Sequence, residues 1–188
     1  MSKKIKTPIS DEALKELKAG DRVLLTGYVY TARDAAHKRL AELLTQGKPL
    51  PFDINKQTIY YVGPTPAKEG RPIGSAGPTT SYRMDAYTPA LMEKGLKGMI
   101  GKGERSREVI AAMKKHGAVY FASIGGAAAL TAKCVITSEL VAYGDLGAEA
   151  VMRLYVEDLP LIVAIDSEGN NFYEIGQKEY LNSTGVEE

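Results

Sequence analysis

The sequence predicts an α/β fold whose sheets contain both parallel and antiparallel strands. Helical and strand-like segments alternate through the middle of the chain, an arrangement typical of layered α/β proteins. Near the carboxyl end, the turn sequence Asp166-Ser-Glu-Gly-Asn-Asn lies between two apolar segments and predicts an antiparallel hairpin. A hairpin would exclude a purely parallel sheet, so we expect mixed sheets.

Helices are expected where apolar residues recur at helical spacing between residues that begin or stop helices. Ser10 is a suitable N-cap for the first helix, and Gly20 is its stop. Gly47, Gly95 and Gly117 follow the next three. The expected helices cover residues 11–18, 31–45, 81–94 and 106–116, and residues 125–133 form a small-residue turn that leads into another.

Strands are expected where β-branched and aromatic residues form short runs between turn-forming residues. The runs cover residues 22–30, 57–62, 97–100, 118–123, 135–137, 151–156, 161–165 and 172–175. Residues 63–77 are a loop dense in glycine and proline. Loops this long inside a compact domain are uncommon and often functional.

The length of 188 residues suits a single domain over residues 1–188. Within it, residues 1–20 are expected to form an N-terminal appendage and residues 180–188 a frayed tail. The hydrophobic fraction of 44% and the charged fraction of 25% exclude a disordered or fibrous chain.

Charge and cysteine content exclude several classes of partner. The net charge of +1 creates no overall field that would attract nucleic acid or an anionic membrane. No apolar stretch reaches the roughly 18 residues of a membrane span, and the amino terminus lacks the apolar run of a signal peptide. The sole cysteine, Cys134, cannot form an internal disulfide, which is typical of a cytoplasmic protein. One cysteine is also too few for an iron–sulfur cluster or a structural zinc, so no metal site is expected on this chain.

Three expected strand-to-helix junctions each carry a cation, and the first is Thr31-Ala-Arg-Asp-Ala-Ala-His-Lys-Arg39. A helix start attracts anions through its free N–H groups, and Arg33 there can grip a carboxylate with two hydrogen bonds. His37 lies four residues later on the same helix face. The alternative is a solvated basic face in which His37 is structural, the more common role of an isolated histidine.

The second junction is Gly74-Ser-Ala-Gly-Pro-Thr-Thr-Ser-Tyr-Arg-Met-Asp85. Its small residues place Thr79 and Thr80 at a helix start. Arg83 lies four residues after Thr79, so its side chain can reach the same helix start. Helix capping would explain Thr80, and Asp85 would then be an ordinary first-turn charge. Capping does not explain why a loop of glycine, alanine and proline precedes the threonines.

The third junction is Gly98-Met-Ile-Gly-Lys-Gly-Glu-Arg105, in which Lys102 lies between two glycines at a strand end. Strand ends line the ligand crevice in α/β folds, although an exposed lysine in a tight turn fits equally well. The small residues of Ser123-Ile-Gly-Gly-Ala-Ala-Ala-Leu130 favour close helix–sheet packing over a close approach of the backbone to a ligand or another subunit. Together, Arg33, Arg83 and Lys102 beside hydroxyls predict a site for a small dianion such as a dicarboxylate. These residues supply neither a strong acid–base pair nor a metal site, so they do not identify a reaction.

Several of these strings resemble a known family. Ser75-Ala-Gly-Pro-Thr-Thr-Ser-Tyr-Arg-Met-Asp85 is similar to a signature of the carboxy-terminal region of class I fumarases and of the β subunit of L-tartrate dehydratases. Further strings resemble other blocks of that family in the same order: Arg33-Asp-Ala-Ala-His-Lys-Arg39, Lys102-Gly-Glu-Arg105, Ser123-Ile-Gly-Gly-Ala-Ala-Ala-Leu130 and Val156-Glu-Asp-Leu-Pro160. The resemblance extends over residues 21–177, and several blocks in order are more specific than any one of them.

The resemblance implies a swivelling β/β/α domain with mixed sheets. In that family the domain works with a larger α subunit or domain whose cysteines hold a 4Fe–4S cluster, and one iron of the cluster binds the substrate. The chain is therefore expected to be the small subunit of a hetero-oligomeric hydro-lyase that interconverts fumarate and (S)-malate. It would bind no cluster alone and would share its active site with the α subunit. Self-association of the isolated chain stays an open alternative.

By position, the resemblance assigns Arg33, Arg83 and Lys102 to the substrate carboxylates and Thr79 to removal of the C3 proton of malate. A threonine hydroxyl is a poor base, so this role requires neighbouring cations that stabilise its alkoxide. The acid for the departing hydroxyl would come from the partner subunit. Supporting roles are expected for His37, Thr80, Asp85 and Glu104.

One departure from the family pattern is Glu104, which stands where asparagine often follows Lys-Gly. The added carboxylate would either alter the substrate preference or pair with Arg105. Two other functions stay open. The chain would serve the dehydration of L-tartrate to oxaloacetate, whose substrate differs by one hydroxyl, or it would be a non-catalytic dicarboxylate-binding module.

Overall fold

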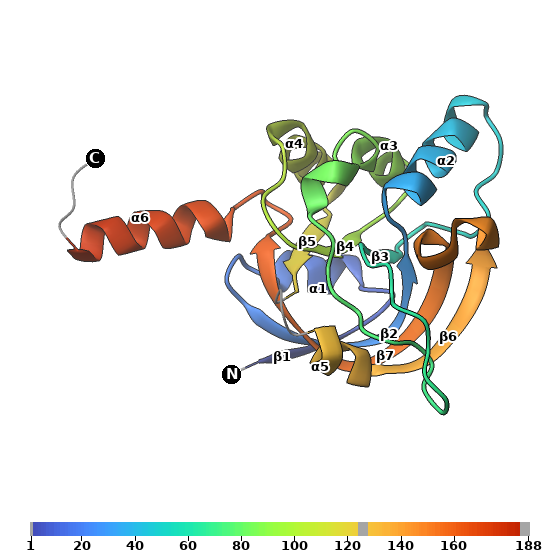
Figure 1. Cartoon of the computed structure of the whole chain (residues 1–188). Coiled ribbons are helices and arrows are strands. Elements are labelled where there is room, and N and C mark those ends of the chain that lie inside the picture. The colour runs from blue at the N-terminus through green and yellow to red at the C-terminus, as the bar shows by residue number, and fades with distance from the viewer. Residues whose placement is uncertain (1, 124–127, 185–188) are drawn as a thin grey trace.

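The strands of the protein close into a small barrel (Figure 1). The computed structural model describes residues 2–123 and 128–184. Within this described part, five strands form the barrel, and β7 closes it by pairing with both β5 and β2. The five are β2 (Arg22–Thr31), β3 (Thr58–Tyr60), β4 (Gly98–Gly101), β5 (Val119–Ala122) and β7 (Val151–Ile165).

The barrel is mixed, as the sequence predicts. β2, β3, β4 and β5 are parallel neighbours in that order, whereas β7 is antiparallel to both of its barrel neighbours. Outside the barrel, β1 (Lys3–Lys6) is parallel to β2, and β6 (Val135–Ala142) is antiparallel to β7. The first residues therefore join the sheet, and Ile9, Leu14 and Leu17 after them are buried.

Helices α2, α3 and α4 lie side by side against the barrel (Figure 1). They connect the parallel strands, because parallel neighbours need a long crossover that is usually helical. α6 projects away from the barrel (Figure 1). No described helix is long and apolar enough to cross a lipid bilayer. The described helices are α1 (Asp11–Glu16), α2 (Asp34–Thr45), α3 (Thr88–Glu93), α4 (Arg107–His116), α5 (Ala128–Lys133) and α6 (Phe172–Thr184), with the 3-10 helices η1 (Ser81–Met84) and η2 (Gly144–Glu149).

Side chains of the barrel strands alternate between two buried layers, because successive residues of a strand point to opposite faces. Tyr60, Ile100 and Phe121 belong to the apolar cluster inside the barrel. Ile59 and Met99 belong to the cluster between the barrel and the surrounding helices. Parallel strands that are covered on both faces are apolar throughout, which explains the short continuous apolar runs of β3, β4 and β5.

The predicted return strand over residues 172–175 is wrong, because this segment begins α6. The turn before it forms only an isolated bridge between Ile165 and Asn171. Ile162 in β7 already pairs with Arg22 on one side and with Ala122 on the other. Both edges of β7 are therefore occupied there, and a returning strand has no edge to join.

Two other elements differ from the prediction in their extent. The expected helix over residues 81–94 is interrupted between η1 and α3, because Pro89 fits the first turn of a helix but would break its interior. The two strands expected over residues 151–156 and 161–165 are one strand, β7. Asp158 has a φ of +46° in it, so a local distortion accommodates the polar interruption without ending the strand. Residues 125–127 of the predicted small-residue turn lie outside the described residues.

The buried guanidinium of Arg105 holds together the segments that follow β3 and β4. Its Nε donates to Asp85 Oδ1 at 2.7 Å, and its Nη2 donates to Thr88 Oγ1 at 3.0 Å. The ring centroids of Tyr61 and Tyr120 lie 5.4 and 5.0 Å from its Cζ, within cation–π range. A buried charge is costly unless it is paired and hydrogen-bonded, so these contacts determine how the segments pack.

Asp85→Asn is expected to lower the free energy of unfolding by about 3 kcal/mol, because it leaves the buried charge of Arg105 without its carboxylate. Chemical denaturation of the purified chain measures this loss. Asp145→Asn is the matched control, since it breaks the exposed ion pair with Arg39 and should cost less than about 1 kcal/mol. Equal losses in the two variants would show that the buried Asp85–Arg105 pair stabilises the fold no more than an exposed pair does.

Candidate anion-binding site

The carboxyl ends of β2, β3 and β4 lie next to one another, because these strands are parallel neighbours. The segments after them carry the predicted site residues. Arg33 follows β2, Thr79 contacts the residue after β3, and Lys102 directly follows β4. The three predicted junctions therefore meet at one edge of the barrel, the usual place for ligands in α/β folds.

The segment of Thr79 and Thr80 is held through its backbone. The Thr79 N–H donates to the Tyr61 carbonyl at 2.6 Å, and the Thr79 carbonyl accepts from the Lys102 N–H at 3.3 Å. Thr80 and Lys102 form a parallel β-bridge. These contacts place both threonines beside Lys102.

Close packing of η1 against β4 makes this bridge possible. The Ser81 N–H donates to the Lys102 carbonyl at 2.9 Å, and Ser81 Oγ lies 2.9 Å from the Tyr120 hydroxyl. A Cβ on Gly101 would lie 2.0 Å from Ser81 Oγ, a distance that no packing allows. The end of β4 therefore needs a glycine so that η1 can approach it.

Arg33 is the N-cap of α2, and a carboxylate of the protein already faces it. Arg33 Nη2 lies 3.2 Å from Glu149 Oε1, and the two side chains are 23% and 25% exposed. Glu149 Oε2 also accepts from the Ala35 N–H at 3.1 Å. The helix start that the sequence predicts as an anion site thus holds the carboxylate of Glu149.

Arg83 lies in η1 and pairs through its Nη2 with Asp34 Oδ2. Asp34 is the chain neighbour of Arg33, so this ion pair brings both arginines to the start of α2. The side chain of Lys102 is exposed and forms no ion pair with the described residues. Lys102 therefore carries the unbalanced positive charge among these three cations.

His37 is fully buried beneath the first turn of α2. Its Nδ1 lies 3.0 Å from the Arg33 carbonyl oxygen, and its ring meets that of Tyr61 edge-on, with centroids 5.2 Å apart. Burial lowers the pKa of His37 to about 4, so the ring is neutral at neutral pH. Its buried Nε2 has no hydrogen-bond partner in the described part of the chain. This geometry fits a support for the start of α2.

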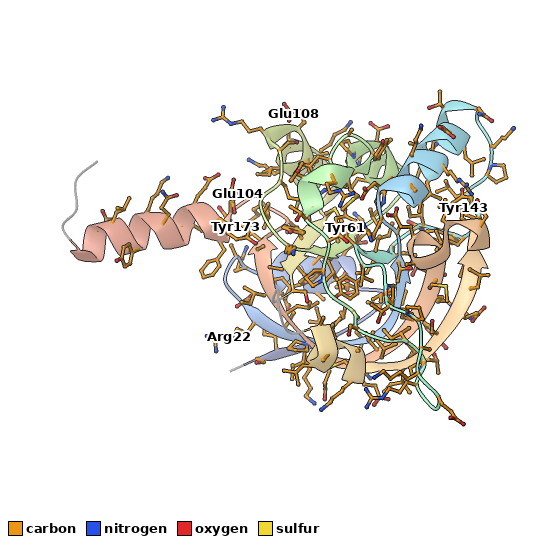
Figure 2. All side chains as sticks on the ribbon, in the orientation of Figure 1. Arg22, Tyr61, Glu104, Glu108, Tyr143 and Tyr173 are labelled. Atoms are coloured by element: carbon orange, nitrogen blue, oxygen red, sulfur yellow. The ribbon has the colours of Figure 1, made fainter. Side chains whose placement is uncertain are left out.

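Asp85 and Glu104, two other predicted supporting residues, differ in their surroundings. Asp85 accepts from Arg105 and from the Ser106 N–H, so it supports the loops around the site. Glu104 is exposed and lies beside Tyr173, where α6 leaves the barrel (Figure 2). The expected alternative in which Glu104 pairs with Arg105 is wrong, because Arg105 is bonded to Asp85.

Sequence reasoning missed two carboxylates at this site, Asp34 and Glu149. Asp34 lies inside the first motif, where its position was evident but its pairing with Arg83 was not. Glu149 is 114 residues from Ala35 along the chain and lies in no pattern that the sequence marks. Only the tertiary contact with Arg33 and Ala35 identifies Glu149 as a residue of this site.

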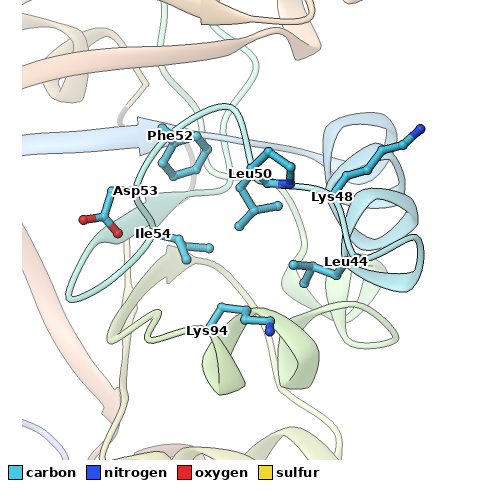
Figure 3. A pocket seen from close by; sticks show the side chains of 9 residues that line it. Leu44, Lys48, Leu50, Phe52, Asp53, Ile54 and Lys94 are labelled. Carbon is cyan, nitrogen blue, oxygen red and sulfur yellow. The ribbon is translucent and has the colours of Figure 1, made fainter.

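A cavity of about 480 Å³ lies at the other end of α2 (Figure 3). It is lined by Leu44, Gly47, Lys48, Pro49, Leu50, Phe52, Asp53, Ile54 and Lys94. None of the predicted site residues lines this cavity, so it is separate from the site. The described residues contain no group of three or more His, Cys, Asp or Glu side chains that could hold a metal ion.

Known fumarate hydratases are similar to this chain over part of their length. The anaerobic class I fumarate hydratase of Escherichia coli is 43% identical over 174 residues, which cover 91% of this chain and 32% of that protein. Fumarate hydratase 2 of Leishmania major is 41% identical over 173 residues, which cover 90% of this chain and 30% of that protein. The chain thus spans about a third of the length of these relatives.

A putative L(+)-tartrate dehydratase subunit beta of Methanocaldococcus jannaschii is similar over nearly its whole length. It is 41% identical over 179 residues, which cover 92% of this chain and 92% of that protein. The family model described as Fumarase C-terminus matches residues 2–176. The resemblance predicted from the sequence motifs is confirmed, and the chain belongs to the fumarase C-terminal family, which makes it homologous to the class I fumarate hydratases.

Proposed function

We propose that this chain is the small subunit of a two-subunit 4Fe–4S hydro-lyase that interconverts fumarate and (S)-malate. The observation that carries the proposal is the gathering of Arg33, Arg83, Lys102 and Thr79 at one edge of the barrel, in a member of the fumarase C-terminal family. Cations at adjacent strand ends suit the two carboxylates of these substrates. We also propose that the chain is a single domain over residues 1–188, of the swivelling β/β/α type.

In this proposal Arg33, Arg83 and Lys102 bind the substrate carboxylates, and Thr79 removes the C3 proton of malate. A threonine alkoxide forms only where positive charge stabilises it. Lys102 fits that need, because backbone contacts hold it beside Thr79 and its own charge is unbalanced within the described residues. The supporting residues are Thr80 in the same segment, His37 beneath the first turn of α2, Asp85, which pairs with Arg105, and the exposed Glu104.

The cluster belongs, in this proposal, to a separate α subunit. The sequence has one cysteine, and the described residues form no set of metal ligands, so this chain does not fit the ligation of a 4Fe–4S cluster. The relative named as a beta subunit supports a partner of this kind. Bound there, the cluster supplies a Lewis acid to the shared site. The acid for the departing hydroxyl likewise comes from the partner, and the hetero-oligomer is cytoplasmic.

Dehydration of L-tartrate is the second candidate function. The relative named as a putative L(+)-tartrate dehydratase subunit beta, 41% identical to this chain, supports it. L-Tartrate and malate differ by one hydroxyl, and both offer two carboxylates to the same cations.

Thr79→Ala is expected to lower kcat at least about 100-fold, because it removes the proposed base. The measurement mixes this chain with its candidate cluster-bearing partner under anaerobic conditions and follows the absorbance of fumarate. Thr45→Ala is the matched control, since Thr45 is exposed at the far end of α2 and its loss should leave turnover unchanged. Full activity of Thr79→Ala would remove Thr79 from the mechanism.

The same assay decides between the candidate functions. Turnover of L-tartrate without turnover of fumarate would assign the second function and keep the mechanism class. If the wild-type mixture converts neither substrate despite an intact cluster and a formed complex, the chain is better explained as a non-catalytic dicarboxylate-binding module.

The structural role of His37 predicts a pH dependence of stability. Its pKa of about 4 in the folded protein lies below the ordinary value of 6.5, so the unfolded chain binds more protons between these values. Stability should therefore fall as the pH falls through this window, by about 2 kcal/mol from His37 alone between about pH 7 and about pH 5.

His37→Gln should remove this part of the pH dependence, as urea denaturation at the two pH values would show. The control is His116→Gln, because His116 is the other histidine of the chain and is not buried. An unchanged pH dependence in His37→Gln would mean that His37 does not carry the effect.

A further inference from the structure

Glu149 binds the start of α2 in the way expected of a substrate carboxylate. One of its oxygens faces Arg33 Nη2 at 3.2 Å, and the other accepts from the Ala35 N–H at 3.1 Å. A single carboxylate thus joins a guanidinium to a first-turn amide, the two features that attract anions at a helix start. The contact is half-buried, where a charged hydrogen bond is stronger than on an open surface.

The chain around Glu149 is held on both sides, so its carboxylate has a defined position. Before it, Arg39 on α2 donates two hydrogen bonds to Asp145, at 2.9 and 2.5 Å. After it, the Thr31 hydroxyl at the end of β2 donates to the Ala150 carbonyl at 3.0 Å and accepts from the Met152 N–H at 2.9 Å. η2 is therefore a strap fixed along α2, with Glu149 at its end.

The backbone at Gly63 also limits the space for the Arg33 guanidinium. A Cβ on Gly63 would lie 2.8 Å from Arg33 Nη1 and 3.0 Å from the Ala148 carbonyl oxygen. The guanidinium is thus confined between the backbone that follows β3 and the strap that carries Glu149. Only a residue without a side chain at position 63 leaves room for both.

We propose that Glu149 is a positioning residue that holds the guanidinium of Arg33 in the orientation in which it binds a substrate carboxylate. The inference rests on the proposed function, which assigns Arg33 to the substrate. A guanidinium has several N–H donors in a fixed fork, and Glu149 engages it through Nη2, so it does not use them all; the buried Nε has no hydrogen-bond partner among the described residues. Glu149 acts through Arg33 and does not touch the reacting atoms.

Glu149→Gln tests this role, because glutamine keeps the shape but loses the charge and turns one acceptor into a donor. In the reconstituted mixture KM should rise about tenfold, while kcat stays within about twofold, since Arg33 binds the ground state and the transition state alike. A merely structural role would lower the amount of active enzyme, and hence kcat, at unchanged KM. Glu139→Gln is the matched control, because it breaks the Glu139–Arg153 ion pair between β6 and β7.

A second measurement does not depend on turnover. NMR of the isolated full chain, labelled at arginine, reports rotation of the Arg33 guanidinium, which should become faster in Glu149→Gln and stay unchanged in Glu139→Gln. Gly63→Ala is a second variant that displaces Arg33 without changing any charge, and it should raise KM in the same way.

The outcomes separate the two proposals. A wild-type mixture without turnover would count against the proposed function, and the NMR comparison would still decide whether Glu149 holds Arg33. An unchanged KM with unchanged Arg33 rotation in Glu149→Gln would overturn the inference. A fall in KM would also overturn it, because it would show that Glu149 competes with the substrate.

Discussion

The buried charge of Arg105 is the constraint on which the site end of the barrel depends. Arg105 follows β4, yet its partners come from four other places: Tyr61 after β3, Asp85 after η1, Thr88 at the start of α3 and Tyr120 in β5. A charge that is removed from water has to be paired where it lies, so these segments cannot pack in another arrangement without losing a partner. The threonine segment and the Lys102 turn take their positions from this packing.

The two site arginines carry their own counter-ions, although Arg33 is partly buried and Arg83 is exposed. Arg33 faces Glu149, and Arg83 faces Asp34, at the start of α2. The carboxylates reduce the repulsion between two neighbouring guanidinium groups and fix their geometry before a ligand arrives. Among the predicted cations, the unbalanced charge is then that of Lys102, which lies beside the proposed base.

Much of the fold follows from local patterns. The apolar runs of β3, β4 and β5 predict buried strands, because both faces of a parallel strand are covered in a crossover fold. Prediction from local patterns failed at residues 172–175, where the structure of the segment depends on whether a strand edge is free to pair. The turn after β7 has a hairpin sequence, but Ile162 is paired on both sides, so the next segment became a helix rather than a strand. Whether a strand edge is free to pair depends on the closed barrel, and no short segment of the sequence predicts it.

The sequence by itself determined the family, the α/β class with mixed sheets and the cations that follow the first parallel strands, because these depend on residue type and order along the chain. The tertiary structure alone decided which carboxylates face Arg33, Arg83 and Arg105. Glu149 meets Arg33 because β7 pairs with β2, and Asp85 meets Arg105 because β3 and β4 are neighbours in the sheet. Contacts between segments that are far apart along the chain depend on how the strands are arranged in the barrel. The spacing of residues in the sequence does not predict that arrangement.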